Sequence, residues 1–331
     1  MNVKHLVSSK FPSVFELARD AYRAVLIRRH KAMTPRQIET ELGRLYKARV
    51  GADLNLSNPQ RYTEKIQWSK LYDHNPMRSL LSDKFACREW VAERIGCQYL
   101  IPLLGVWDHA DEIDFEKLPN RFVIKTNNAS GTNAFVEDKE STDLGRLRRK
   151  LSKWLAFEDA WYLFDMQYDA IEPKVIAEQY MVDGDGSREL KDYKFMCFNG
   201  EPRFVWVDVD RYSDHRRAVF DMEWKRQPWV QYDYPKLEEE VPRPACFDEM
   251  ITIARALSQG FGHVRVDLYS INGRPYFGEM TFTNGSGFER IIPDRYDRVI
   301  GDYWDLSLQK ASGLVEKERP SKGFTLRDGN V

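Results

Sequence analysis

The chain has 331 residues, 42% of them hydrophobic and 13% aromatic, which is enough for a substantial core in one large domain or two. Its 50 Lys and Arg residues nearly balance its 51 Asp and Glu residues, so the net charge of −1 gives no global attraction to nucleic acid or to an anionic membrane. The four cysteines form no Cys-x-x-Cys or Cys/His pattern, the N-terminus has no apolar signal segment, and no apolar run approaches the ~18 residues of a membrane span, so free thiols and a cytoplasmic location are expected.

The first 80 residues are expected to form a helical N-terminal region. Residues 13–32 have the pattern of an amphipathic helix that ends in a basic cluster, residues 28–31. Its polar face also carries Glu16 and Asp20, which favours packing of the apolar face on the protein body. Contact with the inner face of the cell membrane is the alternative.

Three further helix starts follow. Thr34-Pro35 begins a helix that ends near Gly51, and Asn58-Pro59 begins another. Ser82-Asp83 begins a third, which stops at Gly96 and has Lys84 in its first turn. A lysine there opposes the helix dipole, and a nearby anion would relieve this; an ordinary solvated lysine is the alternative.

The segment 121–133 combines a strand with a loop of small residues. Phe122 and Ile124 alternate with Val123 and Lys125, which predicts a strand. Residues 127–133 then have little side-chain bulk and many free N–H groups, so this loop can fold over a polyphosphate. Lys125 would add a point charge on the same phosphates. The segment is not a P-loop, and an ordinary turn is the alternative.

Helical and strand patterns alternate along the rest of the chain. We expect a helix over 142–157, a buried strand over 174–181, a polar loop over 183–191, strands from Asp192 and over 204–209, and a helix over 246–259. Alternation places Asp192 and Lys194 on one face of their strand. This order of elements indicates an α+β domain with a largely antiparallel sheet.

Residues 263–288 read as a hairpin that has charged side chains on both strands. Arg265 and Asp267 share one face of the first strand, and Glu279 lies on the second strand. A two-residue loop would place Asp267 and Glu279 on opposite faces, so we expect a three-residue loop, 272–274, which sets them directly across from each other. Such a pair of carboxylates suits Mg²⁺. A surface hairpin with solvated charges is the alternative.

Five short sequence motifs, in the order in which they occur along the chain, resemble the ATP-grasp superfamily. The resemblance is in particular to its TupA-like branch, named for teichuronopeptide biosynthesis. The motifs are Leu81–Lys84, Tyr99–Gly105, Leu118–Lys125, Asp192–Phe195 and Gly278–Thr281. The resemblance covers about residues 60 to 305. It implies an α+β ATP-grasp fold, in which two subdomains with largely antiparallel sheets clasp ATP behind the helical N-terminal extension. The expected divisions are 1–80, a catalytic domain 81–310 with a small lid subdomain about 118–180 and a larger part about 190–305, and a tail 311–331.

The resemblance also implies roles for individual residues. Those that would contact ATP are the two lysines Lys84 and Lys125, the lid residues Asn128, Ser130 and Gly131, the adenine hinge Glu178, Gln179 and Met181, and the ribose ligand Asp192. Arg265 and Lys194 would be catalytic, and Asp267 and Glu279 would hold one or two Mg²⁺ ions. Many ATP-grasp enzymes have an asparagine two residues after the metal-binding glutamate, where this chain has Thr281. Asn284 from the next loop is therefore a further candidate ligand.

The implied reaction is ATP-dependent ligation of a carboxylate to an amine through an acyl phosphate. The acceptor would be a uronic-acid carboxylate of a bacterial surface polysaccharide or its lipid-linked precursor, and the amine an amino acid or amino alcohol. Candidates to hold the uronate are Arg211, Arg216 and Arg217; the alternative is that they form a solvated basic cluster. The aromatic residues Trp206, Tyr212, Trp224, Trp229, Tyr232 and Tyr234 would stack on sugars or pack in the core. A sugar kinase and a non-catalytic nucleotide- or polysaccharide-binding module are the alternatives, with no nucleic-acid partner.

Overall fold

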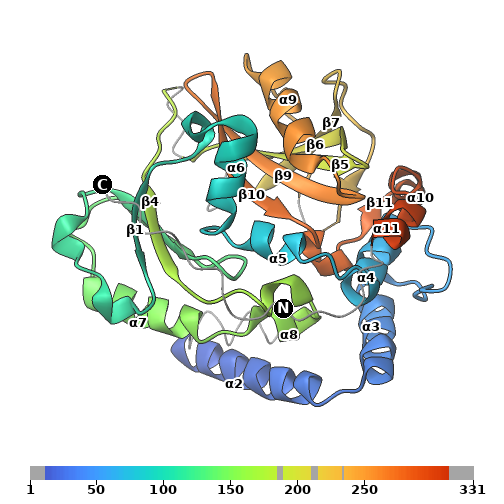
Figure 1. Ribbon diagram of the computed structural model, residues 1–331, viewed down its shortest axis with the longest axis horizontal. Coiled ribbons are helices and arrows are strands. Elements are labelled where there is room, and N and C mark those ends of the chain that lie inside the picture. The colour runs from blue at the N-terminus through green and yellow to red at the C-terminus, as the bar shows by residue number, and fades with distance from the viewer. Residues whose placement is uncertain (1–11, 185–188, 210–214, 233–234, 313–331) are drawn as a thin grey trace.

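A computed structural model of the chain describes residues 12–184, 189–209, 215–232 and 235–312, and it has an α+β architecture (Figure 1). The helices are α2 (Pro12–Lys31), α3 (Pro35–Val50), α4 (Tyr62–Tyr72), α5 (Met77–Ser82), α6 (Cys87–Ile95), α7 (Leu144–Leu155), α8 (Asp159–Leu163), α9 (Phe247–Ser258), α10 (Arg295–Asp302) and α11 (Leu306–Ser312). The strands are β1 (Leu103–Trp107), β2 (Phe122–Thr126), β3 (Asn133–Val136), β4 (Val175–Gln179), β5 (Asp192–Phe198), β6 (Glu201–Val209), β7 (Arg216–Asp221), β8 (Val230–Gln231), β9 (His263–Ile271), β10 (Arg274–Thr281) and β11 (Ile291–Ile292).

A four-stranded antiparallel sheet in the order β1-β4-β2-β3 forms the smaller layer. Phe122 and Ile124 are fully buried on one face of β2 and pack in a cluster with Leu147 and Leu151 of α7. The alternate residue Lys125 therefore points to the opposite face of the sheet. The predicted alternation in this strand is confirmed, and it turns Lys125 away from the core.

A five-stranded antiparallel sheet in the order β10-β9-β5-β6-β7 forms the larger layer. Val264, Val266 and Leu268 of β9 are buried in a cluster that includes α9. The opposite face is covered by α4 and α10 through a second apolar cluster. Because side chains alternate along a strand, Arg265 and Asp267 lie on that second face. Both faces of the larger sheet are therefore covered by other elements.

The helices before the first sheet differ from expectation at their starts. Thr34 and Gln37 form a capping box at α3, and Gly51 ends that helix at φ 87°, as predicted. However, α4 begins only at Tyr62 and α6 only at Cys87, so the prediction that Lys84 lies in a first helical turn is wrong. The Asp83 carboxylate accepts from the backbone N–H groups of Phe85 and Ala86 and makes a tight turn there. Among the described helices, none is both long enough and apolar enough to cross a membrane.

The hairpin of β9 and β10 reaches the expected arrangement by a different route. Its loop has two residues, Asn272 and Gly273 at φ 53° and 72°, so the predicted three-residue loop is wrong. The register shifts instead between Phe277 and Glu279, where Gly278 forms a bulge. One extra residue reverses the parity of the strand, so Glu279 still pairs directly with Asp267. The prediction that the two carboxylates face each other is confirmed.

Replacement of Gly278 by alanine tests the bulge. The new Cβ would lie 3.1 Å from the Asp267 carbonyl oxygen and 3.1 Å from a ring carbon of Tyr269, so the backbone has to shift. We expect Gly278→Ala to lower the free energy of unfolding by about 1–3 kcal/mol, measured by chemical denaturation. The control is Gly43→Ala within α3, where nothing lies within 4 Å, and it should be neutral or stabilising. Equal stability of Gly278→Ala and the unaltered chain would contradict this account.

Candidate active site

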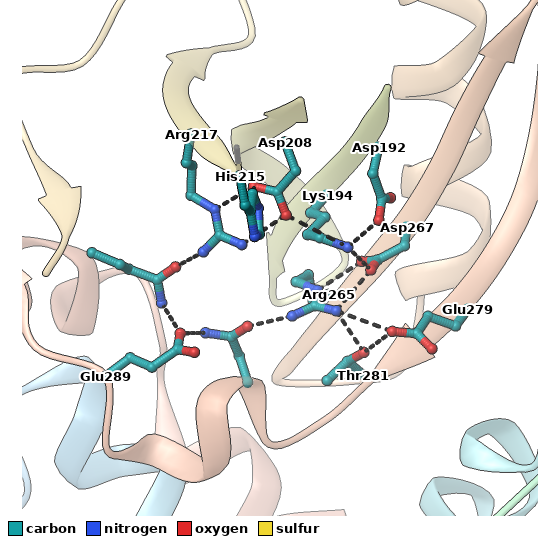
Figure 2. A network of polar contacts seen from close by, with 12 residues as sticks. Asp192, Lys194, Asp208, His215, Arg217, Arg265, Asp267, Glu279, Thr281 and Glu289 are labelled. Carbon is teal, nitrogen blue, oxygen red and sulfur yellow. Dashed lines mark hydrogen bonds and ion pairs between the residues drawn. The ribbon is translucent and has the colours of Figure 1, made fainter. Parts of the chain in front are cut away.

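A buried guanidinium joins the two carboxylates of the hairpin (Figure 2). Arg265 is 8% exposed, and its Nε and Nη2 donate to the two carboxylate oxygens of Asp267 at 2.7 Å each. The same Nη2 lies 3.2 Å from Oε1 of Glu279 and 3.1 Å from Oγ1 of Thr281. Both carboxylates raise the pKa of Arg265 against the opposing effect of burial, so the group stays a cation. The predicted catalytic arginine and both predicted metal ligands therefore meet at one point.

Lys194 of β5 holds Asp267 from the other side. Lys194 and Asp267 are paired in the register of β5 and β9, and Lys194 Nζ donates to Asp267 at 2.7 Å and also to Asp192. Asp192 is only 1% exposed. The structure places its carboxylate in this ion network, and its predicted role as a ribose ligand stays a prediction.

Hydrogen bonds extend the network from Arg265 to Glu289 and on to the ion pair of Arg217 with Asp208, all labelled in Figure 2. Asn284 is buried, its amide oxygen accepts from Arg265, and its amide nitrogen donates to Glu289 at 3.5 Å. Gln231 donates to Glu289 and accepts from Arg217. Thr281 rather than Asn284 thus lies beside Glu279, at 3.4 Å, so the predicted contribution of Asn284 to the metal site is not supported by this geometry.

Two of the three arginines proposed to hold a uronate are described, and each is paired with an acidic residue. Arg217 is 4% exposed, donates to both oxygens of Asp208 and lies 4.8 Å over the Trp206 ring. Arg216 pairs with the exposed Glu239, and Arg211 lies outside the described residues. Burial acts to raise the pKa of Asp208, but Arg217 overcomes it and lowers that pKa. Arg217 is therefore committed to an internal pair.

Three of the aromatic residues proposed to stack on sugars, Trp206, Trp224 and Trp229, follow the packing alternative. Trp206 and Trp229 are fully buried in the core, and Trp224 stacks on Phe220 at 4.4 Å. Tyr232 is 60% exposed, next to the Arg290 guanidinium at 3.9 Å. Tyr212 and Tyr234 lie outside the described residues.

A cavity of about 820 Å³ lies between the two sheets. Its walls include Lys125 of β2, residues 178–182 at and beyond the end of β4, and Tyr269 and Gly278 of the larger sheet. This volume is in the range of cavities that hold small-molecule ligands. The predicted hinge residues Glu178, Gln179 and Met181 all line it. Glu189 lines it as well, which sequence reasoning missed because a single glutamate in a polar loop has no distinguishing pattern.

The Glu178 carboxylate orders the cations at the rim of this cavity. Lys125 Nζ lies 2.6 Å from one carboxylate oxygen, and Arg88 donates to the other at 3.0 Å. Lys84 donates to the Ala129 carbonyl of the lid loop at 2.7 Å. Burial lowers the pKa of Lys84, while the nearby Glu279 carboxylate opposes this. Both predicted phosphate ligands are thus near the hairpin and hold internal oxygens that phosphate oxygens can replace.

The predicted lid loop has a bonded stem and an exposed tip. At the stem, Asn127 exchanges hydrogen bonds with Lys174 at 3.1 and 2.7 Å. At the tip, Ser130 and Gly131 are exposed, and Gly131 has φ 72°. The Asn128 side-chain oxygen is buried with no hydrogen-bond partner in the part of the chain that the structure describes. A loop with a fixed stem and few contacts at its tip suits a lid.

A second cavity, of about 270 Å³, opens between the lid tip and Arg265. Its walls include Ser130, Glu279 and two acids that sequence reasoning missed, Asp159 and Asp165. Burial, and secondly Asp165, raise the pKa of Asp159 to about 6, although the Ser130 N–H bond at 3.2 Å, Lys84 and Arg23 lower it. A carboxylate that titrates near neutral pH in a cleft can accept a proton from a bound group. No periodic pattern in 157–169 marked these two residues.

The acidic residues fit a divalent cation that also contacts phosphate. Among the described residues, no three His, Cys, Asp or Glu side chains cluster as an all-protein metal site requires. Mg²⁺ does not need one, because it binds through one or two carboxylates plus substrate phosphates and water. Asp267 and Glu279 supply such a pair, and with Asp192 they outnumber the two cations Arg265 and Lys194. Glu279, with 36% of its side chain exposed, is the accessible member.

Comparison with known proteins gives one sequence match. A family model described as TupA-like ATPgrasp matches residues 64–305. No curated protein matches the chain in sequence. Among solved structures, D-alanine–D-alanine ligase from Bacillus anthracis has 17% identity and a TM-score of 0.42, with 71% of each chain covered. N5-carboxyaminoimidazole synthase from Aspergillus clavatus has 11% identity and a TM-score of 0.36, covering 65% of this chain and 46% of that one. At these values the structural likeness carries no argument about chemistry.

The raised pKa of Asp159 predicts a pH-dependent stability. Its pKa is about 6 in the folded chain against an ordinary 3.8, so the folded state binds more protons between these values. The stability that the protonated carboxyl contributes is therefore present below about pH 3.8 and lost as the pH rises through 6. We expect Asp159→Asn to be more stable than the unaltered chain by about 1–3 kcal/mol near pH 7.5 and equal to it near pH 4.

The measurement is chemical denaturation of both proteins at the two pH values. Asp111→Asn is a matched control, because Asp111 is exposed on the surface, and it should change stability at neither pH. A destabilised Asp159→Asn near pH 7.5 would show that the ionised carboxylate is needed to hold the lid through Ser130.

Proposed function

The chain belongs to the TupA-like ATPgrasp family and is an ATP-grasp ligase, and we propose that it joins a uronic-acid carboxylate to an amine. The acceptor is a bacterial surface polysaccharide or its lipid-linked precursor, and the amine is an amino acid or an amino alcohol. The observation that carries the ligation chemistry is Arg265, buried between Asp267 and Glu279, where it lines the small cavity under the lid tip. The family resemblance supports the carbohydrate acceptor.

The reaction has two balanced steps. A carboxylate oxygen attacks the γ-phosphorus of ATP, and the bond from that phosphorus to the β-phosphate oxygen breaks. ADP is the leaving group, and the carboxylate becomes an acyl phosphate. The amine then attacks the acyl carbon, phosphate leaves, and the amine nitrogen loses a proton as the amide forms. Asp267 and Glu279 would hold Mg²⁺, which when bound offsets the negative charge of the phosphates.

The residues of the chain serve both steps. Lys84 and Lys125 bind phosphate oxygens in place of the Ala129 and Glu178 oxygens that they contact here. Arg265 is a preorganised donor for the charge that develops on the transferring phosphoryl group and later on the tetrahedral oxyanion. Asp159 is placed to accept the proton of the amine, because it lines the same cavity as Arg265. The lid tip, closed over this cavity, excludes the water that would hydrolyse the acyl phosphate.

A screen of uronic acids against amines tests the proposal. With a matched pair, ADP release should rise on addition of the amine, and mass spectrometry should show one amide for each ADP. A kinase would release ADP with the sugar alone and give a phosphorylated sugar. A non-catalytic module would release no ADP under any combination, and either result would overturn the ligase assignment.

Replacement of Glu279 by glutamine tests the metal site. A neutral amide supplies less negative charge to a divalent cation, so Glu279→Gln should raise the Mg²⁺ concentration needed for half-maximal ADP release and lower kcat by about 10²-fold. Glu116→Gln, a change of the same kind at an exposed position, is the control. An unchanged Mg²⁺ dependence in Glu279→Gln would remove Glu279 from the metal site.

A further inference from the structure

A strongly basic groove runs between α2 and α7. It encloses about 1330 Å³, and eight of the side chains that line it are Lys or Arg against three that are Asp or Glu. This imbalance is local, because the whole chain has a net charge of −1. A concave surface lined by one sign of charge concentrates the field and attracts ligands of the opposite sign. The groove is therefore built for an anion.

The groove leads into the cavity that holds Arg265. Arg23 of α2, Ser130 of the lid tip and Phe157 line both spaces. The Arg23 guanidinium lies 5.5 Å from the centre of the Phe157 ring and 5.0 Å from that of Tyr162. Its Nε is buried and has no hydrogen-bond partner among the described residues. An anionic group at this junction would satisfy that donor.

The N-terminal helix supplies one wall of the groove. Figure 1 shows α2 running beneath α7 and α8, and two ion pairs fasten it there, Asp20 with Lys153 and Lys31 with Glu158. This helix lies outside residues 64–305, which match the family model. This wall of the groove is therefore formed by a segment outside the region that the family model matches.

We propose that the α2–α7 groove binds an anionic oligosaccharide, several carboxylates long, whose reacting uronate reaches the cavity beside Arg265. The inference rests on the proposed function, and it specifies a polymeric acceptor. One carboxylate engages one or two cations, whereas eight lining cations match a chain that carries a charge on successive sugars. A membrane surface fits less well, because these cations line a concavity between two helices and not a flat face.

Binding without nucleotide tests the groove separately from the reaction. The probes are a tetramer of galacturonic acid, the monomer, and a neutral glucose tetramer, measured by calorimetry at low salt. The unaltered chain should bind the charged tetramer at least tenfold more tightly than either other probe. Two exposed residues, Arg28 on α2 and Arg146 on α7, line the groove, and the double variant R28Q/R146Q should weaken binding of the tetramer about tenfold.

The matched control removes the same charge elsewhere. Arg36 on α3 and Arg298 on α10 are exposed and do not line the groove, so R36Q/R298Q should bind the tetramer as the unaltered chain does. In turnover, R28Q/R146Q should raise KM for the charged tetramer and leave kcat and the KM for ATP unchanged. This split separates a binding role from damage to the fold.

The outcomes against the groove are distinct. Equal binding of the neutral tetramer, equal loss in both double variants, or no binding of the charged tetramer would each overturn it. If R28Q/R146Q keeps the tetramer but loses binding to vesicles with anionic lipid, the basic wall serves a membrane and the proposal is wrong. If R28Q/R146Q loses tetramer binding, but neither the unaltered chain nor a variant forms an amide, the groove is supported and the proposed ligation is wrong.

Discussion

The pairing of Arg265 with Asp267 is the interaction on which the site depends. A buried charge is costly unless it is paired and hydrogen-bonded, and removal of one partner leaves the other uncompensated. Here one guanidinium binds both oxygens of Asp267, and Lys194 holds the same carboxylate from the neighbouring strand. Because β5, β9 and β10 must all keep their register for these contacts, the ion network and the central strands of the larger sheet stabilise each other.

The hairpin shows how a local irregularity places chemistry. A regular two-residue hairpin would turn Glu279 to the opposite face from Asp267, toward the apolar cluster under α9. The bulge at Gly278 reverses the parity of the last residues of β10 and brings Glu279 next to the shared guanidinium. Gly278 also lines the cavity between the sheets. The same residue therefore forms part of the cavity wall and sets the direction of the Glu279 side chain.

Basic and acidic side chains are separated around the site. Lys125 lines the cavity between the sheets, and Lys84 contacts the lid loop. The acids Asp159 and Glu279 line the small cavity under the lid, and the basic groove opens beyond it. In the proposed reaction, a triphosphate, an amine and an anionic chain would each meet the opposite sign of charge on a different side of the site. The lid tip borders both the small cavity and the groove, so its closure would act on both spaces.

The sequence alone determined the strands and helices whose apolar periodicity is strong, and the antiparallel α+β class. It also identified the candidate site residues, which are Arg265, Asp267, Glu279, Lys125 and the lid loop. These features are local, because alternation and turn residues act over a few positions. Only the tertiary structure decided the partners: Asp192 in the ion network, Arg217 on Asp208, Asp159 opposite the lid and α2 against α7. Such contacts join residues distant along the chain or on neighbouring strands, and they depend on how whole elements pack and on a one-residue bulge, which side-chain periodicity does not encode.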